Sequence, residues 1–285
     1  MKTLKEHYSR PEVQREILDF CRGRWVALHY AYSGGNLSFK RYTNEGKPIK
    51  INGLEDLARV NNGALRSIYA TANVYRRLQC VEDLYDYANI AYCTPTWDVD
   101  GDLSNWRETI RVAGEIVRFL GDQGVRRSVY IKWSGNGCHI HINEKSISGS
   151  LLEKYSPLDL AYAIVEYVNS RLSLDSTGIL CGGKVTVENK IDLTRVFTCP
   201  LSLHRELDAV CVCMKAEDLE KFNPKWVNPQ TFRHDPDWRE FKDGEADGLA
   251  EKAYKAVGGY LFKPRKKRRK TKPLDEQILE WLQKE

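Results

Sequence analysis

Hydrophobic positions in this chain follow two periods, one helical and one typical of strands, and together they predict a mixed α/β protein. Helical spacing occupies residues 11–21, 105–120 and 157–168, and strand-like runs occupy residues 25–32, 90–99, 129–133, 138–142, 185–187, 196–198 and 209–214. Residues 54–75 are predicted to be largely helical. From residue 90 onward the order is strand, helix, strand, strand, helix, strand, strand, which is typical of an α/β sandwich with a mixed or antiparallel sheet.

The length of 285 residues suits one large domain or two small ones. Apolar residues make up 42% and charged residues 29%, as in soluble globular proteins. We expect a folded body over residues 1–262, with an N-terminal αβ unit of about 1–90 and a second half of about 91–262. Residues 263–285 are expected to form a basic linker followed by a short terminal helix.

The excess of positive charge is confined to the C-terminal segment. Of 44 basic and 39 acidic residues, residues 263–285 hold nine basic and four acidic, which leaves 35 of each in residues 1–262. We expect this arm to bind nucleic-acid backbone through a run of four basic residues, Lys266, Lys267, Arg268 and Arg269. The apolar side of residues 275–283 is a candidate docking peptide for a partner such as a large subunit or another replication or repair protein.

Cysteine spacing and hydropathy exclude several protein classes. The eight cysteines form no C-x-x-C pair, so neither structural zinc nor a disulfide framework is predicted. No apolar run has the length of a membrane span, and the first residues lack the apolar core of a signal peptide. We therefore expect a cytoplasmic, nucleoid-associated protein without a membrane partner, or a nuclear one if the source is eukaryotic.

Two acidic residues at the end of one predicted strand are the first candidates for chemistry. Asp98 and Asp100 stand two positions apart, so both side chains would project from the same face of a strand. Neighbouring carboxylates repel unless a cation lies between them, and hard oxygen ligands suit Mg²⁺ or Mn²⁺. The alternative is a solvated strand end that runs into an Asp-Gly turn.

Two further segments carry residues suited to anion binding. The turn that begins at Ser134 and includes Gly137 lets backbone amides approach an anion, and His139 follows on an alternating strand. A second segment contains Asp192, a possible third metal ligand. It continues through four residues that we expect near a polyphosphate, namely Arg195, Ser202, His204 and Arg205.

In this order and spacing, these motifs resemble those of the archaeo-eukaryotic primase superfamily, in particular the small catalytic subunit of archaeal and eukaryotic DNA primases. That family pairs Asp-x-Asp with Ser-Gly…Gly-x-His and places an Asp eight residues before a Pro-x-Ser-Leu-His run. Asp192 precedes Pro200 by that spacing here, and the resemblance covers roughly residues 5–215. This chain departs from the family at Thr198, where a basic residue is usual, and a zinc knuckle is not evident.

The resemblance implies a primase-polymerase fold with an RRM-like βαββαβ catalytic half. It also implies template-directed nucleotidyl transfer by a two-metal mechanism, in primer synthesis, primer extension or gap filling. Asp98, Asp100 and Asp192 would bind Mg²⁺ or Mn²⁺, while Ser134, His139 and His204 would contact the triphosphate of an NTP or dNTP. The partners would be a DNA template and primer.

Two other function classes stay open. His139 and His141 have the His-x-His form by which replication initiators and relaxases bind a metal, and Tyr162 or Tyr167 would then be the nucleophile that nicks single-stranded DNA. A packed, structural role is the simpler interpretation of His141. The third class is a non-catalytic homologue that binds nucleic acid, although clustered carboxylates without a cation would be costly.

Overall fold

The computed structural model describes residues 4–32, 37–101, 103–172 and 185–260. Its strands form two larger sheets, one four-stranded and one five-stranded, together with a two-stranded ribbon. The predicted basic arm and terminal helix, including Lys266 to Arg269, lie outside the described residues. Among the described helices, none combines the length and the apolar character needed to cross a bilayer.

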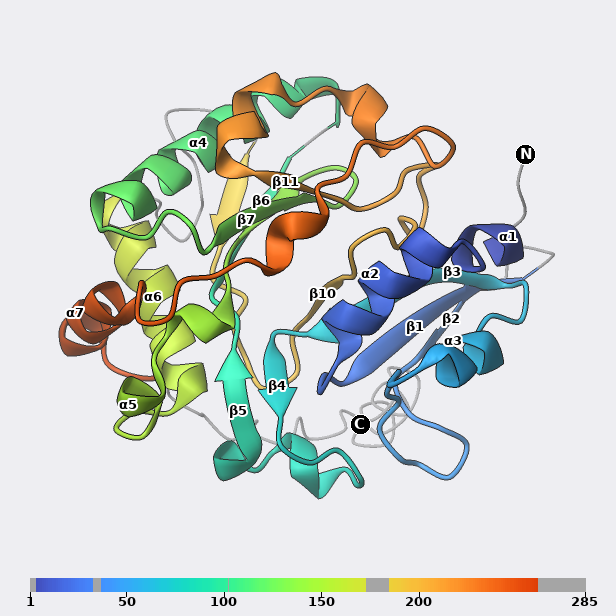
Figure 1. The fold of residues 1–285 in the computed structure, drawn as a ribbon, viewed down its shortest axis with the longest axis horizontal. Coiled ribbons are helices and arrows are strands. Elements are labelled where there is room, and N and C mark those ends of the chain that lie inside the picture. The colour runs from blue at the N-terminus through green and yellow to red at the C-terminus, as the bar shows by residue number, and fades with distance from the viewer. Residues whose placement is uncertain (1–3, 33–36, 102, 173–184, 261–285) are drawn as a thin grey trace, which may run out of the picture.

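The four-stranded sheet belongs mostly to the N-terminal part of the chain. Its strand order is β10-β3-β1-β2, where β10 spans Val196–Thr198, and every neighbouring pair is antiparallel. Helices α1 and α2 pack against β3, and α3 packs beside α2 (Figure 1). The elements of this part are α1 (Leu4–Tyr8), α2 (Pro11–Cys21), β1 (Val26–Ala31), β2 (Leu37–Lys40), α3 (Leu54–Val60) and β3 (Leu65–Thr71).

The expected helix over residues 54–75 is wrong in its second half. The segment forms the short helix α3, then the strand β3 and the first strand of the ribbon, β4 (Asn73–Tyr75). Asn61, Asn62 and Gly63 interrupt the helix, and Gly63 has a φ of 87°, which favours glycine. Beyond the break, β3 is held by antiparallel pairing with β1.

The five-stranded sheet has the order β11-β7-β8-β6-β9, again with antiparallel neighbours throughout. Its chain order β6-α4-β7-β8-α6-β9 is the βαββαβ arrangement that the sequence predicted. Helices α4 and α6 pack against one face, and α7 packs on α6 (Figure 1). The elements of this part of the chain are β5 (Ile90–Cys93), which pairs with β4 in the ribbon, β6 (Thr96–Asp100), α4 (Trp106–Asp122), β7 (Val129–Trp133), β8 (Cys138–Ile142), α5 (Gly149–Leu152), α6 (Pro157–Arg171), β9 (Thr186–Glu188), β10 (Val196–Thr198), which pairs with β3, β11 (Val212–Lys215) and α7 (Asp247–Val257).

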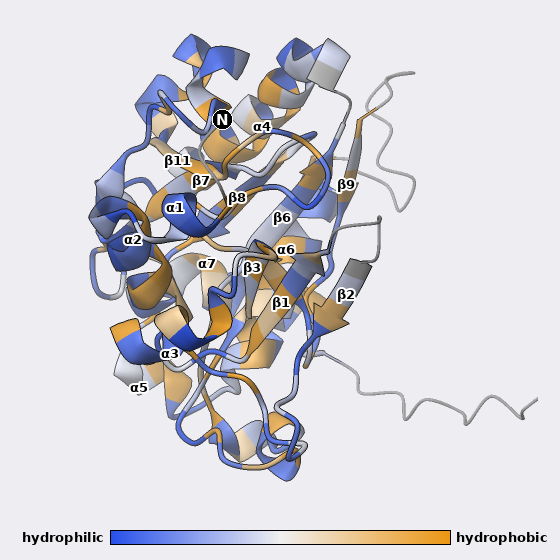
Figure 2. Ribbon diagram, turned by 90° about the vertical axis from the view of Figure 1, so that its right-hand side faces the viewer, coloured by the Kyte–Doolittle hydropathy of each residue, from blue (hydrophilic) through white to orange (hydrophobic). Residues whose placement is uncertain are grey.

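Strand β10 connects the two halves. It follows β9 in the chain but pairs with β3 in the four-stranded sheet. The Phe197 ring in β10 lies 5.1 Å from the ring of His139 in β8, so β10 lies against the five-stranded sheet as well. Buried Lys132 in β7 donates from Nζ to the Thr198 carbonyl at 2.8 Å. Figure 2 shows strands of both sheets in one view, turned by 90° from Figure 1. The motifs of the second half therefore lie next to the sheet of the N-terminal part.

Candidate active site

Strand β6 places Asp98 and Asp100 on the sheet face that α4 and α6 leave uncovered. Trp97 and Val99, which alternate with them, are fully buried and point to the helix-covered face. Asp98 is 4% exposed, whereas Asp100 at the strand end is exposed. The expected common orientation of the two carboxylates follows from this alternation.

Cross-strand pairing brings two more polar side chains beside Asp98. Asp98 pairs with His139 in β8 on one side and with Glu188 in β9 on the other. Directly paired residues project from the same face. The His139 Nε2 atom lies 3.1 Å from Asp98 Oδ1. Burial lowers the pKa of His139 even though Asp98 acts to raise it, so the imidazole is neutral near pH 7.

Two cationic side chains complete the surroundings of Asp98. Lys190 Nζ and Arg195 NH2 lie 2.7 Å and 2.8 Å from Asp98 Oδ2. Burial acts to raise the pKa of Asp98, but His139 and Lys190 outweigh it and hold that pKa far below its usual value. Asp98 is therefore ionised at any physiological pH.

Lys190 also joins the other carboxylates of this face. Its Nζ lies 2.8 Å from Asp100 Oδ2 and 3.1 Å from Glu188 Oε2. Three carboxylates thus surround one ammonium group. Within the described residues, no three His, Cys, Asp or Glu side chains are already arranged as ligands around one point. The donor chemistry nevertheless fits Mg²⁺ or Mn²⁺, because three hard anionic oxygens enclose a cation here.

Asp192, the expected third ligand, lies in the turn between β9 and β10. Its Oδ1 accepts hydrogen bonds from the Thr194 amide at 2.6 Å and the Thr194 hydroxyl at 3.2 Å. Its backbone carbonyl accepts from Asn73 Nδ2 at 3.0 Å. Glu188 is the acid that cross-strand pairing brings beside Asp98. The spacing to Pro200 predicted Asp192 as the third ligand, whereas Glu188, which ends a strand of only three residues, carried no signal in the sequence.

The Ser134 to Gly137 turn lies against both β6 and the later motif. The Ser134 amide donates to the Gly137 carbonyl at 3.0 Å, which closes the turn. A Cβ on Gly137 would stand 2.2 Å from the Val99 carbonyl, so only glycine allows this approach to β6. Gly135 has a φ of 139°, and a Cβ there would stand 2.4 Å from the His204 ring. The Ser134 to Gly137 turn and the segment that carries His204 are therefore in contact.

His204 and Ser202 have different roles in the Pro200 segment. His204 Nδ1 accepts from the amides of Leu207 at 2.9 Å and Glu206 at 3.2 Å, which leaves Nε2 as the protonated nitrogen of the neutral ring. Burial lowers the pKa of His204. The fully buried Ser202 Oγ accepts from the Ile68 amide at 2.7 Å, so this hydroxyl attaches the segment to β3.

These elements enclose a polar cleft of about 360 Å³. Eight of the ten predicted residues in the described part of the chain line it, and Asp192 and Ser202 do not. Three further lining residues were not predicted from the sequence, because nothing in their residue type or spacing distinguishes them from ordinary surface residues. They are Tyr69, Asn136 and Lys190. The eight predicted lining residues are Asp98, Asp100, Ser134, Gly137, His139, Arg195, His204 and Arg205.

The geometry does not favour the nicking alternative. The His141 Nδ1 atom lies 2.8 Å from the Thr96 hydroxyl, and its ring stacks on Tyr130 with the centroids 4.7 Å apart. His139 and His141 face Phe197, whereas α6, which carries Tyr162 and Tyr167, packs on the opposite face of the sheet. The tyrosines are therefore separated from the histidines by the sheet itself.

Comparison with known proteins gives a structural match. No family model and no curated protein matches the sequence. Among solved structures, the polymerase domain from Mycobacterium tuberculosis Ligase D in complex with DNA matches with a TM-score of 0.55 and 14% identity, over 90% of this chain and 88% of that one. The chain has the fold of that polymerase domain. The match confirms the predicted primase-polymerase fold class.

Proposed function

We propose that this protein is a template-directed nucleotidyltransferase of the primase-polymerase type. The observation that carries the proposal is that Asp98, Asp100 and Glu188 surround the Lys190 ammonium group, and that Asp98, Asp100 and Lys190 line one cleft with Ser134 and His204. Its fold, shared with a polymerase domain that is in complex with DNA, supports a DNA template and primer as partners. The substrate would be an NTP or dNTP.

The residues of the site divide into two groups, carboxylates and hydrogen-bond donors. Asp98, Asp100 and Glu188 would hold Mg²⁺ or Mn²⁺. When bound, the metal would lower the pKa of a primer 3′-hydroxyl and stabilise the negative charge that develops on the phosphate of the transferred nucleotide. The Ser134 hydroxyl, the His204 Nε2–H and the Arg205 guanidinium would donate to the triphosphate. Arg195 pairs with Asp98 Oδ2 at 2.8 Å and helps to fix the orientation of that carboxylate.

We propose a structural role for Asp192, in place of the metal-binding role that its spacing to Pro200 predicted. Its carboxylate accepts from Thr194 and shapes the turn that carries Lys190 and Arg195. We assign the third metal-binding carboxylate to Glu188 because Glu188, unlike Asp192, is paired with Asp98 across the sheet.

A non-catalytic protein that binds nucleic acid is the second candidate. The Lys190 ion pairs favour it, because the ammonium group neutralises the carboxylates without any metal. The sequence argument that clustered carboxylates require a metal is therefore weaker once the contacts are known.

Primer extension separates the two candidates. A bare single strand, a primed template and a gapped duplex would each be offered with ribo- or deoxynucleotides, in Mg²⁺ or Mn²⁺. The proposal predicts addition of the nucleotide complementary to the template, and loss of addition with a chelator. Binding of the templates without incorporation under any of these conditions would support the non-catalytic candidate instead.

A further inference from the structure

Lys190 is a cationic side chain that the proposed reaction does not use. Its Nζ lies within 3.1 Å of one oxygen from each of Asp98, Asp100 and Glu188. An ammonium group has three N–H donors, and here each has a carboxylate acceptor. Lys190 therefore stands where three anionic oxygens converge, which is where a divalent cation would bind.

The backbone that carries Lys190 is fixed, while its side chain has a route to solvent. Asn189 Nδ2 donates to the Tyr162 carbonyl at 3.1 Å, which anchors this turn to α6. Asn189 Oδ1 accepts from the Ile191 amide at 3.1 Å, which closes the turn around Lys190. The Lys190 side chain is 20% exposed and lines the cleft. The ammonium group can therefore leave the carboxylates without any movement of the sheet.

Asp98 remains paired when Lys190 leaves, because Arg195 NH2 also lies 2.8 Å from its Oδ2 and His139 Nε2 lies 3.1 Å from its Oδ1. A divalent cation bound to the same oxygens would stand within a few ångströms of the ammonium group. Repulsion between like charges at that separation is strong in a partly buried cleft. The two cations therefore exclude each other.

We propose that Lys190 is a built-in competitor of the divalent metal, an ammonium latch that neutralises Asp98, Asp100 and Glu188 until the metal displaces it. This inference rests on the proposed function, since it takes the same carboxylates as the metal ligands. It assigns to Lys190 control over metal affinity, without a role in the chemistry.

The first test is Mn²⁺ binding in the absence of nucleotide, measured by the electron paramagnetic resonance signal of free Mn²⁺. A latch that is closed for about nine-tenths of the time weakens binding about tenfold. Lys190→Gln should therefore bind Mn²⁺ about tenfold more tightly than wild type, and Lys190→Arg should stay close to wild type. Lys221→Gln is the matched control, because Lys221 pairs with Asp218 at 2.9 Å outside the cleft.

The second test uses the wild-type protein, so it does not depend on how well a variant folds. Lysines would be acetylated with a succinimidyl ester at several Mn²⁺ concentrations and quantified by peptide mass spectrometry. Displacement of the ammonium group predicts that Lys190 is labelled faster as Mn²⁺ binds, while labelling of Lys221 stays constant. A Lys190 labelling rate that is unchanged or reduced by Mn²⁺ would overturn the latch.

Asp98→Asn separates failure of the latch from failure of the proposed function. If Asp98→Asn abolishes Mn²⁺ binding while Lys190→Gln binds as wild type does, the latch is wrong and the metal site stands. If Asp98→Asn leaves Mn²⁺ binding unchanged, the proposed metal site is wrong, and the latch is wrong with it.

Discussion

At the scale of single residues, the site is organised around one buried carboxylate. Asp98 is 4% exposed and contacts His139, Lys190 and Arg195 within 3.1 Å. A buried carboxylate is stable as an ion only when such partners offset the lost hydration. Asp100 and Glu188 are more exposed and share Lys190 with it. Asp98 is therefore the carboxylate of the cluster whose position is fixed by its contacts, and its two neighbours are freer to move.

Glu188 and Asp192 give opposite predictions for activity. Glu188→Gln removes one of the three charges that would hold the metal, so we expect nucleotide incorporation to fall by at least about a hundredfold. Asp192→Asn removes a carboxylate that accepts from Thr194 in the turn, and it should leave incorporation within about tenfold of wild type. Single-turnover rates at saturating Mn²⁺ measure both. A larger loss in Asp192→Asn than in Glu188→Gln would restore Asp192 as the third ligand.

At the scale of elements, the short helix α1 positions the Pro200 segment. His7 Nε2 lies 2.8 Å from the Leu201 carbonyl, and the Tyr8 hydroxyl accepts from the Leu203 amide at 3.1 Å. The same hydroxyl donates to the Arg66 carbonyl of β3 at 2.7 Å. Leu201 adopts a φ of 57°, which is unusual for a residue other than glycine. The helix thus holds a strained segment that presents His204 to the cleft.

The burial of His7 makes the stability of the folded protein dependent on pH. Burial lowers its pKa from 6.5 to about 4, although the hydrogen bond to Leu201 acts to raise it. Because the pKa of His7 is lower in the folded state, neutral His7 makes its full contribution to the free energy of unfolding above about pH 6.5. That contribution is lost as the pH falls towards 4. The loss approaches about 3 kcal/mol, at 1.4 kcal/mol per pKa unit.

Urea unfolding of wild type and His7→Gln between pH 7 and pH 4 tests this prediction. The difference in unfolding free energy between the two proteins should shrink as pH falls, because protonation removes the advantage of the neutral histidine. Parallel pH profiles for the two proteins would contradict the assignment.

The sequence predicted the second half of the chain better than the first. In residues 96–142, β7 and β8 are continuous buried runs, β6 is buried except at Asp100, and α4 has an apolar stripe, so period and burial agree. Residues 61–75 were predicted to be helical, but they form β3 and β4. These strands depend on pairing with β1 and β5, and such pairing is not visible in the sequence of one segment. Glu188 and Lys190 were missed for the same reason, since their position depends on the register of β9 beside β6.

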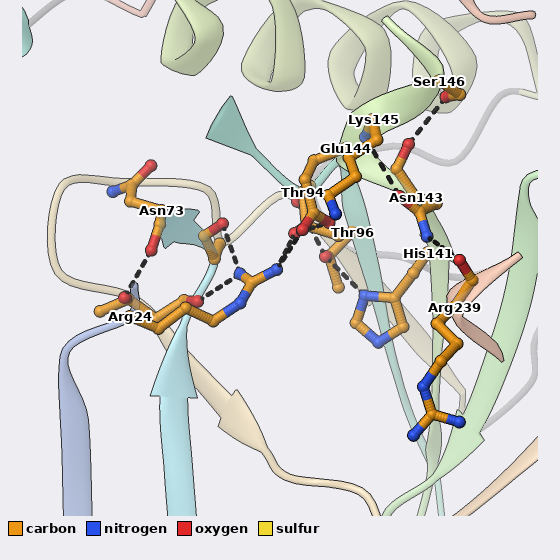
Figure 3. A network of polar contacts seen from close by, with 12 residues as sticks. Arg24, Asn73, Thr94, Thr96, His141, Asn143, Glu144, Lys145, Ser146 and Arg239 are labelled. Atoms are coloured by element: carbon orange, nitrogen blue, oxygen red, sulfur yellow. Dashed lines mark hydrogen bonds and ion pairs between the residues drawn. The ribbon is translucent and has the colours of Figure 1, made fainter. Parts of the chain in front are cut away.

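At the scale of the whole molecule, a buried ion pair joins the two halves (Figure 3). Arg24 NH1 donates to the carbonyls of Thr71 at 2.7 Å and Ala72 at 2.9 Å, and its NH2 donates to Glu144 Oε1 at 2.8 Å. Thr94 donates to the second Glu144 oxygen at 2.9 Å. The pair is almost fully enclosed, with side-chain exposures of 4% and 14%. It links the end of the N-terminal sheet to the segment that follows β8.

Breaking this pair should destabilise the protein as a unit. Glu144→Gln leaves the Arg24 charge buried without its counter-ion, which costs about 3–5 kcal/mol in comparable pairs. Lys255→Gln breaks an exposed pair with Glu251 and should change stability by less than about 1 kcal/mol. Equilibrium urea unfolding measures both. A Glu144→Gln protein as stable as the control would show that the halves are joined by other contacts.

The proposed function depends on Asp98 acting in nucleotidyl transfer. The most direct measurement is the single-turnover rate of adding one complementary nucleotide to a primed template in Mn²⁺. We predict a measurable rate for wild type and Lys221→Gln, and a rate at least about a thousandfold lower for Asp98→Asn. Incorporation by folded Asp98→Asn at the wild-type rate would contradict the proposed site.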